Sequence, residues 1–327
     1  MNERLRPYDG LTPDKVLDAL ESAGLRGDGR LLALNSYENR VYQANLEDGG
    51  HVVAKFYRPH RWSDAQLLEE HAFAHELAGR EVPVVAPLNL NGSTLHRFAE
   101  FRLAVYPRRG GRPPELEDEK VLEWIGRFIG RIHAVGAIAR FSVRPALDIE
   151  SFGDEPRRWL LESNLIAPDL LDAWRAVADL ALQGIRDCFE RMGSFQAIRL
   201  HGDCHSGNVL WTDAGPHFVD LDDCLMGPPV QDLWMLLSGS RREMSEQFTH
   251  LLEGYSHFAS FDARELVLVE SLRTLRMIHY SAWLARRWTD PAFPAAFPWF
   301  VEPRYWENQI LALREQLAAI AEGPLEL

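Results

Sequence analysis

Hydrophobic and polar residues alternate with a period of two in the first third of the chain. The alternation predicts strands at residues 31–34, 41–45, 51–57, 86–90 and 101–106. Turn signals separate two of these pairs, at Asp48-Gly49-Gly50 and at Asn91-Gly92. We therefore expect a small five-stranded antiparallel sheet near the N-terminus.

A helical period replaces the alternation on either side of the first three strands, in residues 12–24 and 63–78. In the second of these segments, Glu70 shares its face with the apolar residues at i+3, i+4 and i+7, whereas Glu69 lies off that face. Glu70 is thus expected to point inward from the main helix of the sheet region.

The chain changes character after a cluster of Pro and Gly at residues 106–114. Beyond it the pattern is mainly helical, and residues 121–133 read as a strongly periodic core helix. A chain of 327 residues with 46% hydrophobic residues can fill two cores. We predict an α+β protein of two lobes, divided into residues 1–107, a linker at 108–116, and residues 117–327.

Charge and cysteine content narrow the class of protein. The chain has 48 acidic and 35 basic residues and a net charge of -13, which disfavours nucleic acid or an anionic membrane as its partner. Its three cysteines form no C-x-x-C pair, and neither a signal core nor a run of about 18 apolar residues is found. We expect a cytoplasmic monomer.

One segment of the helical part carries a chemical pattern, His201-Gly202-Asp203-Cys204-His205-Ser206-Gly207-Asn208, and Asp220 follows twelve residues after its Asn. Two predicted strands, residues 209–211 and 217–219, would return Asn208 and Asp220 to the same place. In-line phosphoryl transfer needs a carboxylate that accepts the proton of the attacking hydroxyl, and oxygen ligands for Mg²⁺ on ATP. We predict Asp203 for the first task, Asn208 and Asp220 as metal ligands, and Asp203 and Asp220 as catalytic residues.

A cation for the phosphates is available upstream at Lys55, whose side chain shares a face of its strand with Val53 and Tyr57. Glu70 is its expected acidic partner. Taken singly, Lys55 is more often a solubility residue of an edge strand and Glu70 a solvated helix charge. The order of the whole set along the chain favours a nucleotide site over these structural alternatives.

Two more segments fit the nucleotide. The turn at residues 35–39 lacks G-x-G-x-x-G, but its small polar residues can offer backbone N–H groups to phosphate. The Pro/Gly break beginning at Tyr106 fits a hinge whose backbone meets the adenine, so Tyr106 joins the predicted nucleotide-binding residues.

The motifs H-G-D-x-x-x-x-N and D-x-D resemble the aminoglycoside and choline phosphotransferase superfamily, whose fold is protein-kinase-like. Four segments are more closely similar to the bacterial stress response kinase A family: residues 34–42, 55–59, 231–237 and 287–293. The resemblance implies a small five-stranded lobe with one main helix and a larger helical lobe. It also implies a cytoplasmic serine/threonine protein kinase linked to stress survival, with Ser36 at the ATP site. The acceptor hydroxyl of such a kinase could belong to another protein or to the kinase itself, by autophosphorylation.

The chain departs from ordinary protein kinases after Asp220. Asp232 follows only twelve positions after Asp220, and no A-P-E occurs, so there is no room for a long activation segment. We expect no regulation by phosphorylation of such a loop. Asp232 is predicted to be structural, accepting backbone N–H groups of the loop that carries Asp203.

Alternatives stay open at this point. Related folds phosphorylate choline, homoserine or aminoglycosides through the same core. His201, Asp203 and His205 could instead hold a zinc or manganese ion in a hydrolase, with Asp220 or Asp222 as a fourth ligand. This alternative leaves Lys55, Glu70 and Asn208 without a role. A pseudokinase scaffold is the non-catalytic alternative, weakened because every catalytic position is filled.

Two further features have both a functional and a structural interpretation. On a helix predicted around residues 266–288, one face carries a recurring set of basic and aromatic side chains: Arg273, Arg276, Tyr280, Trp283 and Arg287. This face could receive an acidic substrate segment, but an ordinary solvated helix face is the commoner case. Cys204 follows Asp203 directly, so its oxidation could inhibit, although a buried, unreactive thiol is more usual.

Overall fold

The computed structural model describes residues 7–327, which pack as two compact units. The first unit contains residues 7–114, Phe141–Arg144 and Gly207–Cys224, and the second contains Glu115–Arg140, Pro145–Ser206 and Leu225–Leu327. The first unit thus takes in two segments from the helical half of the sequence. The predicted limits of the linker stay a prediction.

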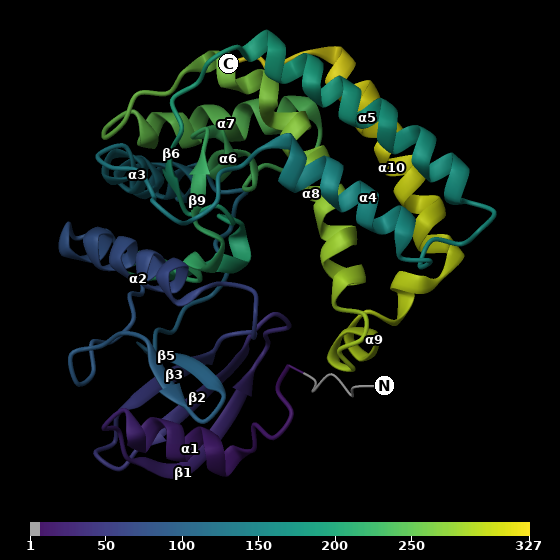
Figure 1. The fold of residues 1–327 in the computed structure, drawn as a ribbon. Helices are drawn as coiled ribbons and strands as arrows, with labels where there is room; N and C mark the ends of the chain where they lie inside the picture. The colour runs from purple at the N-terminus through teal and green to yellow at the C-terminus, as the bar shows by residue number, and fades with distance from the viewer. Residues whose placement is uncertain (1–6) are drawn as a thin grey trace. The chain divides into compact units, whose positions relative to one another are not determined.

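The first unit is built on a five-stranded antiparallel sheet with the order β1-β2-β3-β5-β4 (Figure 1). Its strands are β1 (Gly27–Leu34), β2 (Arg40–Leu46), β3 (His51–Phe56), β4 (His96–Phe98) and β5 (Phe101–Pro107). Lys55 lies in β3, opposite Val41 of β2 and Ala104 of β5. The predicted sheet is confirmed, and Lys55 occupies its middle and not its edge.

One predicted strand is wrong. Residues 86–90 form no strand, and the place of the fifth strand is taken by β4, which follows the turn at Asn91-Gly92. Pro83 and Pro87 have no N–H to donate to a ladder. The amide of Leu88 reaches Val105 O of β5 at 2.6 Å, but this bond is not continued into a pairing of strands.

Helices cover the sheet of the first unit. In α1 (Pro13–Ser22), Thr12 caps the N-terminus, and Val16, Ala19 and Leu20 enter a core with β2, β3 and β5. In α2 (Asp64–Gly79), Ser63 and Gln66 form a capping box. Glu70 lies on the buried side of α2 with 3% of its surface exposed, as the helical period predicts.

A hairpin completes the first unit. Strands β7 (Val209–Thr212) and β8 (Gly215–Phe218) pair antiparallel, which confirms the two predicted strands between Asn208 and Asp220. Hydrogen bonds from Phe218 N to Pro83 O (2.8 Å) and from Val85 N to Phe218 O (2.9 Å) attach the hairpin to the segment after α2. A short 3₁₀ turn, Leu221–Asp223, follows it.

The second unit is mainly helical, as predicted. Its helices are α3 (Glu119–Gly136), α4 (Glu155–Glu162), α5 (Leu171–Met192), α6 (Val230–Trp234), α7 (Arg241–Tyr255), α8 (Val269–Arg286), α9 (Ala292–Ala296) and α10 (Pro303–Glu322). A two-stranded ladder joins β6 (Ile198–Leu200) to β9 (Leu225–Gly227). Helices α5 and α10 run side by side in Figure 1.

Glycine allows a close contact between two helices of the second unit, α3 and α7. A Cβ atom at Gly254 of α7 would lie 1.9 Å from Glu123 O of α3, and one at Gly126 of α3 would lie 2.0 Å from Leu251 O of α7. The backbones of α3 and α7 therefore approach at a distance that only glycine permits.

Within residues 7–327, no helix combines the length and the apolar character that crossing a membrane requires.

Candidate active site

Lys55 is the central cation of the first unit. Its side chain is 8% exposed, and its Nζ lies 2.7 Å from Asp220 Oδ1. This contact joins residues 165 positions apart in the sequence. Burial favours the neutral amine, but the neighbouring carboxylates outweigh it, so the pKa of Lys55 is raised and the side chain stays charged.

Asp222 forms the hub of the charges around Lys55. Its Oδ1 lies 3.3 Å from Lys55 Nζ, and its Oδ2 accepts hydrogen bonds from Asn39 Nδ2 (3.2 Å) and from Arg61 Nη1. Only 3% of its surface is exposed. Burial would raise the pKa of Asp222, but Lys55 and Arg61 lower it below its usual range.

Asp222 is the second acid of the D-x-D motif, whereas Arg61 lies in none of the motifs of the sequence. Arg61 also donates to Asp223 Oδ1 at 2.5 Å. Its contacts with Asp222 and Asp223 span 161 and 162 residues of sequence, so no local spacing signals them.

Glu70 is buried close to this cluster without joining it directly. Within the described residues no ion pair connects Glu70 to Lys55, and Glu70 Oε2 has no hydrogen-bond partner. Burial raises the pKa of Glu70 to about 8, although the charge of Lys55 opposes the shift. The assignment of Glu70 to the nucleotide site stays a prediction.

The neighbouring carboxylate, Glu69, has a structural task. It accepts hydrogen bonds from the backbone N–H groups of three successive residues, Ser142, Val143 and Arg144. This attaches α2 to the segment Phe141–Arg144 within the first unit.

Side-chain hydrogen bonds hold the turn at residues 35–39, which has no glycine. Ser36 Oγ donates to Asn39 O at 3.2 Å, and Arg58 N donates to Asn39 Oδ1 at 3.1 Å. Asn39 is 4% exposed and is itself bound to Asp222. The turn that carries Ser36 is therefore tied to the same carboxylate as Lys55, and the role of Ser36 in ATP binding stays a prediction.

Tyr106 ends a chain of buried and partly buried hydrogen bonds in the first unit. Its hydroxyl lies 2.9 Å from the Tyr57 hydroxyl, which lies 2.7 Å from His71 Nε2, and His71 Nδ1 lies 2.9 Å from Thr94 Oγ1. Burial raises the pKa of Tyr106, so its hydroxyl stays protonated. The chain holds the Tyr106 side chain in place, and the predicted contact of its backbone with adenine stays a prediction.

Asn208 and Asp220 stand at the two ends of the β7–β8 hairpin. Val219 N donates to Asn208 O at 3.0 Å, which closes the hairpin beside both residues. Asp220 adopts a left-handed backbone, with φ 61° and ψ 62°, and half of its side chain is exposed. Such a conformation is uncommon for a residue other than glycine and often marks a functional position.

The donor set at this hairpin suits Mg²⁺. Mg²⁺ prefers oxygen ligands and is commonly held by one or two protein carboxylates, with waters and substrate phosphates completing the octahedron. One carboxylate and one amide oxygen at Asp220 and Asn208 meet that need. Within residues 7–327 no group of three His, Cys, Asp or Glu residues could hold a metal ion, so the hydrolase alternative at His201, Asp203 and His205 has no geometric support.

Asp203 lies in the second unit. Its Oδ1 accepts a hydrogen bond from Arg276 Nη1 at 2.6 Å, and its Oδ2 lies 3.5 Å from His205 Nε2. Burial would raise the pKa of Asp203, but the hydrogen bond from His205 and the charge of Arg276 lower it below its usual range. Asp203 is therefore a carboxylate at neutral pH.

The loop that carries Asp203 is held by Asp232. Asp232 Oδ2 accepts from His201 N and Oδ1 accepts from Gly202 N, both at 2.8 Å, and His133 Nε2 lies 3.0 Å from Oδ2. The predicted structural role of Asp232 is confirmed. Cys204 is fully buried, and burial raises the pKa of its thiol well above the usual range.

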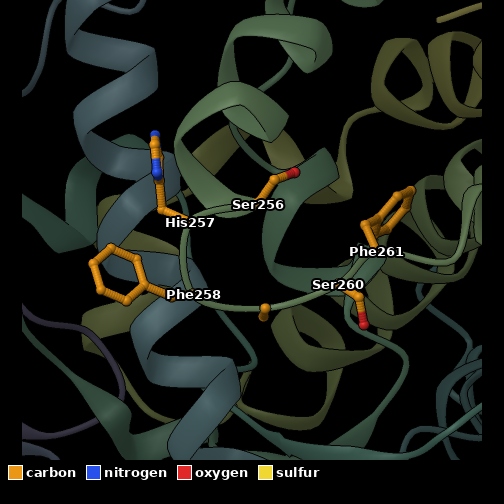
Figure 2. Close-up of a pocket in the computed structure, with 6 residues that line it drawn as sticks. Ser256, His257, Phe258, Ser260 and Phe261 are labelled. Atoms are coloured by element: carbon orange, nitrogen blue, oxygen red, sulfur yellow. The ribbon is translucent and has the colours of Figure 1, made fainter.

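The pocket shown in Figure 2 is formed by other residues. It is lined by the loop after α7, from Ser256 to Phe261, with the Phe258 and Phe261 rings and the Ser256 and Ser260 hydroxyls around it. None of the predicted site residues contributes to it.

Comparison with known proteins identifies the family. Residues 30–267 match the phosphotransferase enzyme family. Stress response kinase A of Escherichia coli K12 is 44% identical over 327 residues, which cover 100% of this chain and 99% of that protein. The chain belongs to the phosphotransferase family and, within it, to the stress response kinase A family.

Other members of the stress response kinase A family match at nearly the same identity. Stress response kinase A of Salmonella typhi is also 44% identical, with 100% of this chain and 99% of that protein covered. The serine/threonine protein kinase RdoA of Salmonella typhimurium LT2 is 43% identical with the same coverage. The sequence resemblance to this family is thereby confirmed.

Solved structures confirm the phosphotransferase fold. The amicoumacin kinase hAmiN, in complex with AMP-PNP and Ca²⁺, superimposes with a TM-score of 0.71 at 19% identity, over 95% of this chain and 94% of that one. A microcompartment-associated aminopropanol kinase gives a TM-score of 0.71 at 16% identity, over 93% and 98% of the two chains.

Proposed function

We propose that this protein transfers the γ-phosphoryl group of ATP, with Mg²⁺, to a Ser or Thr hydroxyl of a protein, in the cytoplasm and in a stress response. The observation that carries phosphoryl transfer is the 2.7 Å contact between Lys55 and Asp220, at the end of the hairpin that begins with Asn208. The protein acceptor is supported by the relative named as a serine/threonine protein kinase, at 43% identity over the full chain.

Each residue has a chemical task in this proposal. Lys55 would bind phosphate oxygens of ATP, and Asn208 and Asp220 would hold Mg²⁺. The bound ion supplies positive charge that offsets the charge developing on the phosphate oxygens. Lys55 approaches Asp220 from the middle strand of the sheet, so the cation and the metal ligand are held by rigid elements.

Asp203 would orient the acceptor hydroxyl and receive its proton. Its lowered pKa keeps it ionised at neutral pH, so it can accept a hydrogen bond from the hydroxyl. A carboxylate of low basicity is suited to orientation more than to early proton abstraction, which agrees with a loose transition state in which the nucleophile needs little activation.

Radiolabelled ATP tests the proposal. Wild-type protein with Mg²⁺ should label its own Ser or Thr or a generic protein substrate. Asp203→Ala should reduce transfer by about 10²- to 10⁴-fold while ATP affinity stays within a few-fold, because this carboxylate faces the acceptor. Asp220→Ala should weaken Mg²⁺-dependent ATP binding itself. Asp213→Ala, at an exposed position on the same hairpin, is the matched control.

Three results would contradict parts of the proposal. Wild-type turnover in Asp203→Ala removes the proton acceptor. ATP binding without any turnover favours the pseudokinase alternative. Turnover of a small amino alcohol or sugar with kcat/KM above roughly 10⁴ M⁻¹s⁻¹, and no labelled protein, favours a small-molecule kinase.

A further inference from the structure

Arg276 contacts the carboxylate that the proposed function assigns to the acceptor. Its Nη1 lies 2.6 Å from Asp203 Oδ1, although the two residues are 73 positions apart in the sequence. Both belong to the second unit, Arg276 on α8 and Asp203 on the loop held by Asp232. A fixed positive charge therefore lies next to the position where an acceptor hydroxyl meets Asp203.

Arg276 retains donors for a second anion. A guanidinium has five N–H donors, and two of them can bind one carboxylate as a fork. Across residues 7–327, the Arg276 side chain donates one hydrogen bond, to Asp203, and 43% of that side chain is exposed. Arg276 can thus bind an incoming carboxylate without leaving Asp203.

Arg273, one turn earlier on α8, is arranged differently. Its Nε lies 3.3 Å from Glu270 Oε2, its guanidinium lies over the Trp234 ring at 5.4 Å, and its side chain is 25% exposed. Arg273 already has a carboxylate that no reaction step requires. The carboxylate that Arg276 binds is that of Asp203, which the acceptor hydroxyl must reach.

The surface of α8 beyond Arg276 is aromatic. Tyr280 and Trp283 follow at four and seven residues, on the same face of the helix. Their rings stack with centroids 5.6 Å apart and an interplanar angle of 21°, and 38% of Tyr280 is exposed. This surface can support an extended polypeptide beside the charge of Arg276.

We propose that Arg276 selects acceptor polypeptides with a carboxylate side chain close to the target Ser or Thr, an inference that rests on the proposed protein-kinase function. The carboxylate must lie within about two residues of the target, since an extended chain advances roughly 3.3 Å per residue and Arg276 touches Asp203 directly. The net charge of -13 repels acidic polypeptides as a whole, so the preference has to come from a local cation.

A peptide series tests this selection. Each peptide has one Ser in a neutral background and one Asp, placed in turn at each position from three before to three after the Ser. A twin peptide carries Asn in place of Asp. We expect the best Asp peptide to exceed its Asn twin about tenfold in kcat/KM, which corresponds to about 1.4 kcal/mol. The ratio should fall as salt is added.

Variants of two arginines test whether the ratio of kcat/KM between Asp and Asn peptides depends on Arg276. Arg276→Gln should bring the Asp/Asn ratio close to one, and Arg276→Lys should keep part of it, because the charge remains without the fork. Arg273→Gln, with the same change of charge on the same helix, should keep the wild-type ratio.

The outcomes separate this inference from the proposed function. Equal labelling of Asp and Asn peptides by the wild type, or an unchanged ratio in Arg276→Gln, overturns the selection and leaves the protein kinase intact. If no peptide and no protein is labelled, the proposed function itself is overturned and the selection with it.

Discussion

Asp222→Asn removes the negative charge at the centre of the charge cluster around Lys55, and the Asn side chain has nearly the same shape as Asp. The carboxylate is 3% exposed and serves Lys55 at 3.3 Å, Arg61, and Asn39 at 3.2 Å. An Asn at this position would turn an N–H₂ group toward at least one of these donors. The variant therefore loses the attraction of a carboxylate for Lys55 and Arg61 and leaves at least one buried donor without this acceptor.

The loss of stability follows from the number of partners. Removing one member of a buried ion pair costs about 3–5 kcal/mol. Here both cations keep a second carboxylate, Lys55 at Asp220 (2.7 Å) and Arg61 at Asp223 (2.5 Å), so we expect about 2–4 kcal/mol. For a protein of 327 residues that lowers the melting temperature by roughly 3–6 °C.

The effect should depend on pH. Folding lowers the pKa of Asp222, so its contribution is present above the unfolded value of about 3.9 and is lost as the pH falls through the folded value. The difference in melting temperature between the wild type and Asp222→Asn should therefore be full at pH 7 and shrink below about pH 4.

Thermal unfolding at pH 7 and pH 3.5 measures both effects, and Asp223→Asn is the matched control. Asp223 also binds Arg61, but its side chain is 44% exposed, so the loss there should stay below about 1 kcal/mol. Equal melting temperatures for the two variants at pH 7 would refute the role of Asp222 as hub.

Three further changes probe buried groups. Glu70→Gln should stabilise the protein at pH 8 but not at pH 4. The pKa of Glu70 is about 8 in the folded protein, above its unfolded value, so the wild type loses stability as the pH rises from the unfolded to the folded pKa. Urea unfolding of both proteins at pH 4 and pH 8 measures this difference. Gly254→Ala should lower the melting temperature by several degrees, since its Cβ would meet Glu123 O at 1.9 Å, whereas Gly79→Ala at the end of α2 meets no atom within 4 Å and lacks that clash. Peroxide should inhibit the wild type and Cys204→Ser equally, because the Cys204 thiol is buried and its pKa is raised; inhibition confined to the wild type would show it to be reactive.

Features that repeat locally were predictable from the sequence. The period of two places Lys55 in a strand, the helical period turns Glu70 inward, and the turn residues between Asn208 and Asp220 return the hairpin on itself. Prediction failed at residues 86–90, where apolar residues read as a strand, because Pro83 and Pro87 remove the donors that a ladder needs.

By itself, the sequence determined the residue types of a phosphotransferase and their order along the chain, since hydrogen-bonding capacity and periodicity are local properties. Only the tertiary structure decided which charges meet. Lys55 was expected to pair with Glu70, fifteen residues away, but its ammonium lies against Asp220 and Asp222. Likewise, Arg276 meets Asp203 across 73 residues. Such pairs depend on how distant elements pack, and a buried charge is stable only where packing supplies its partner.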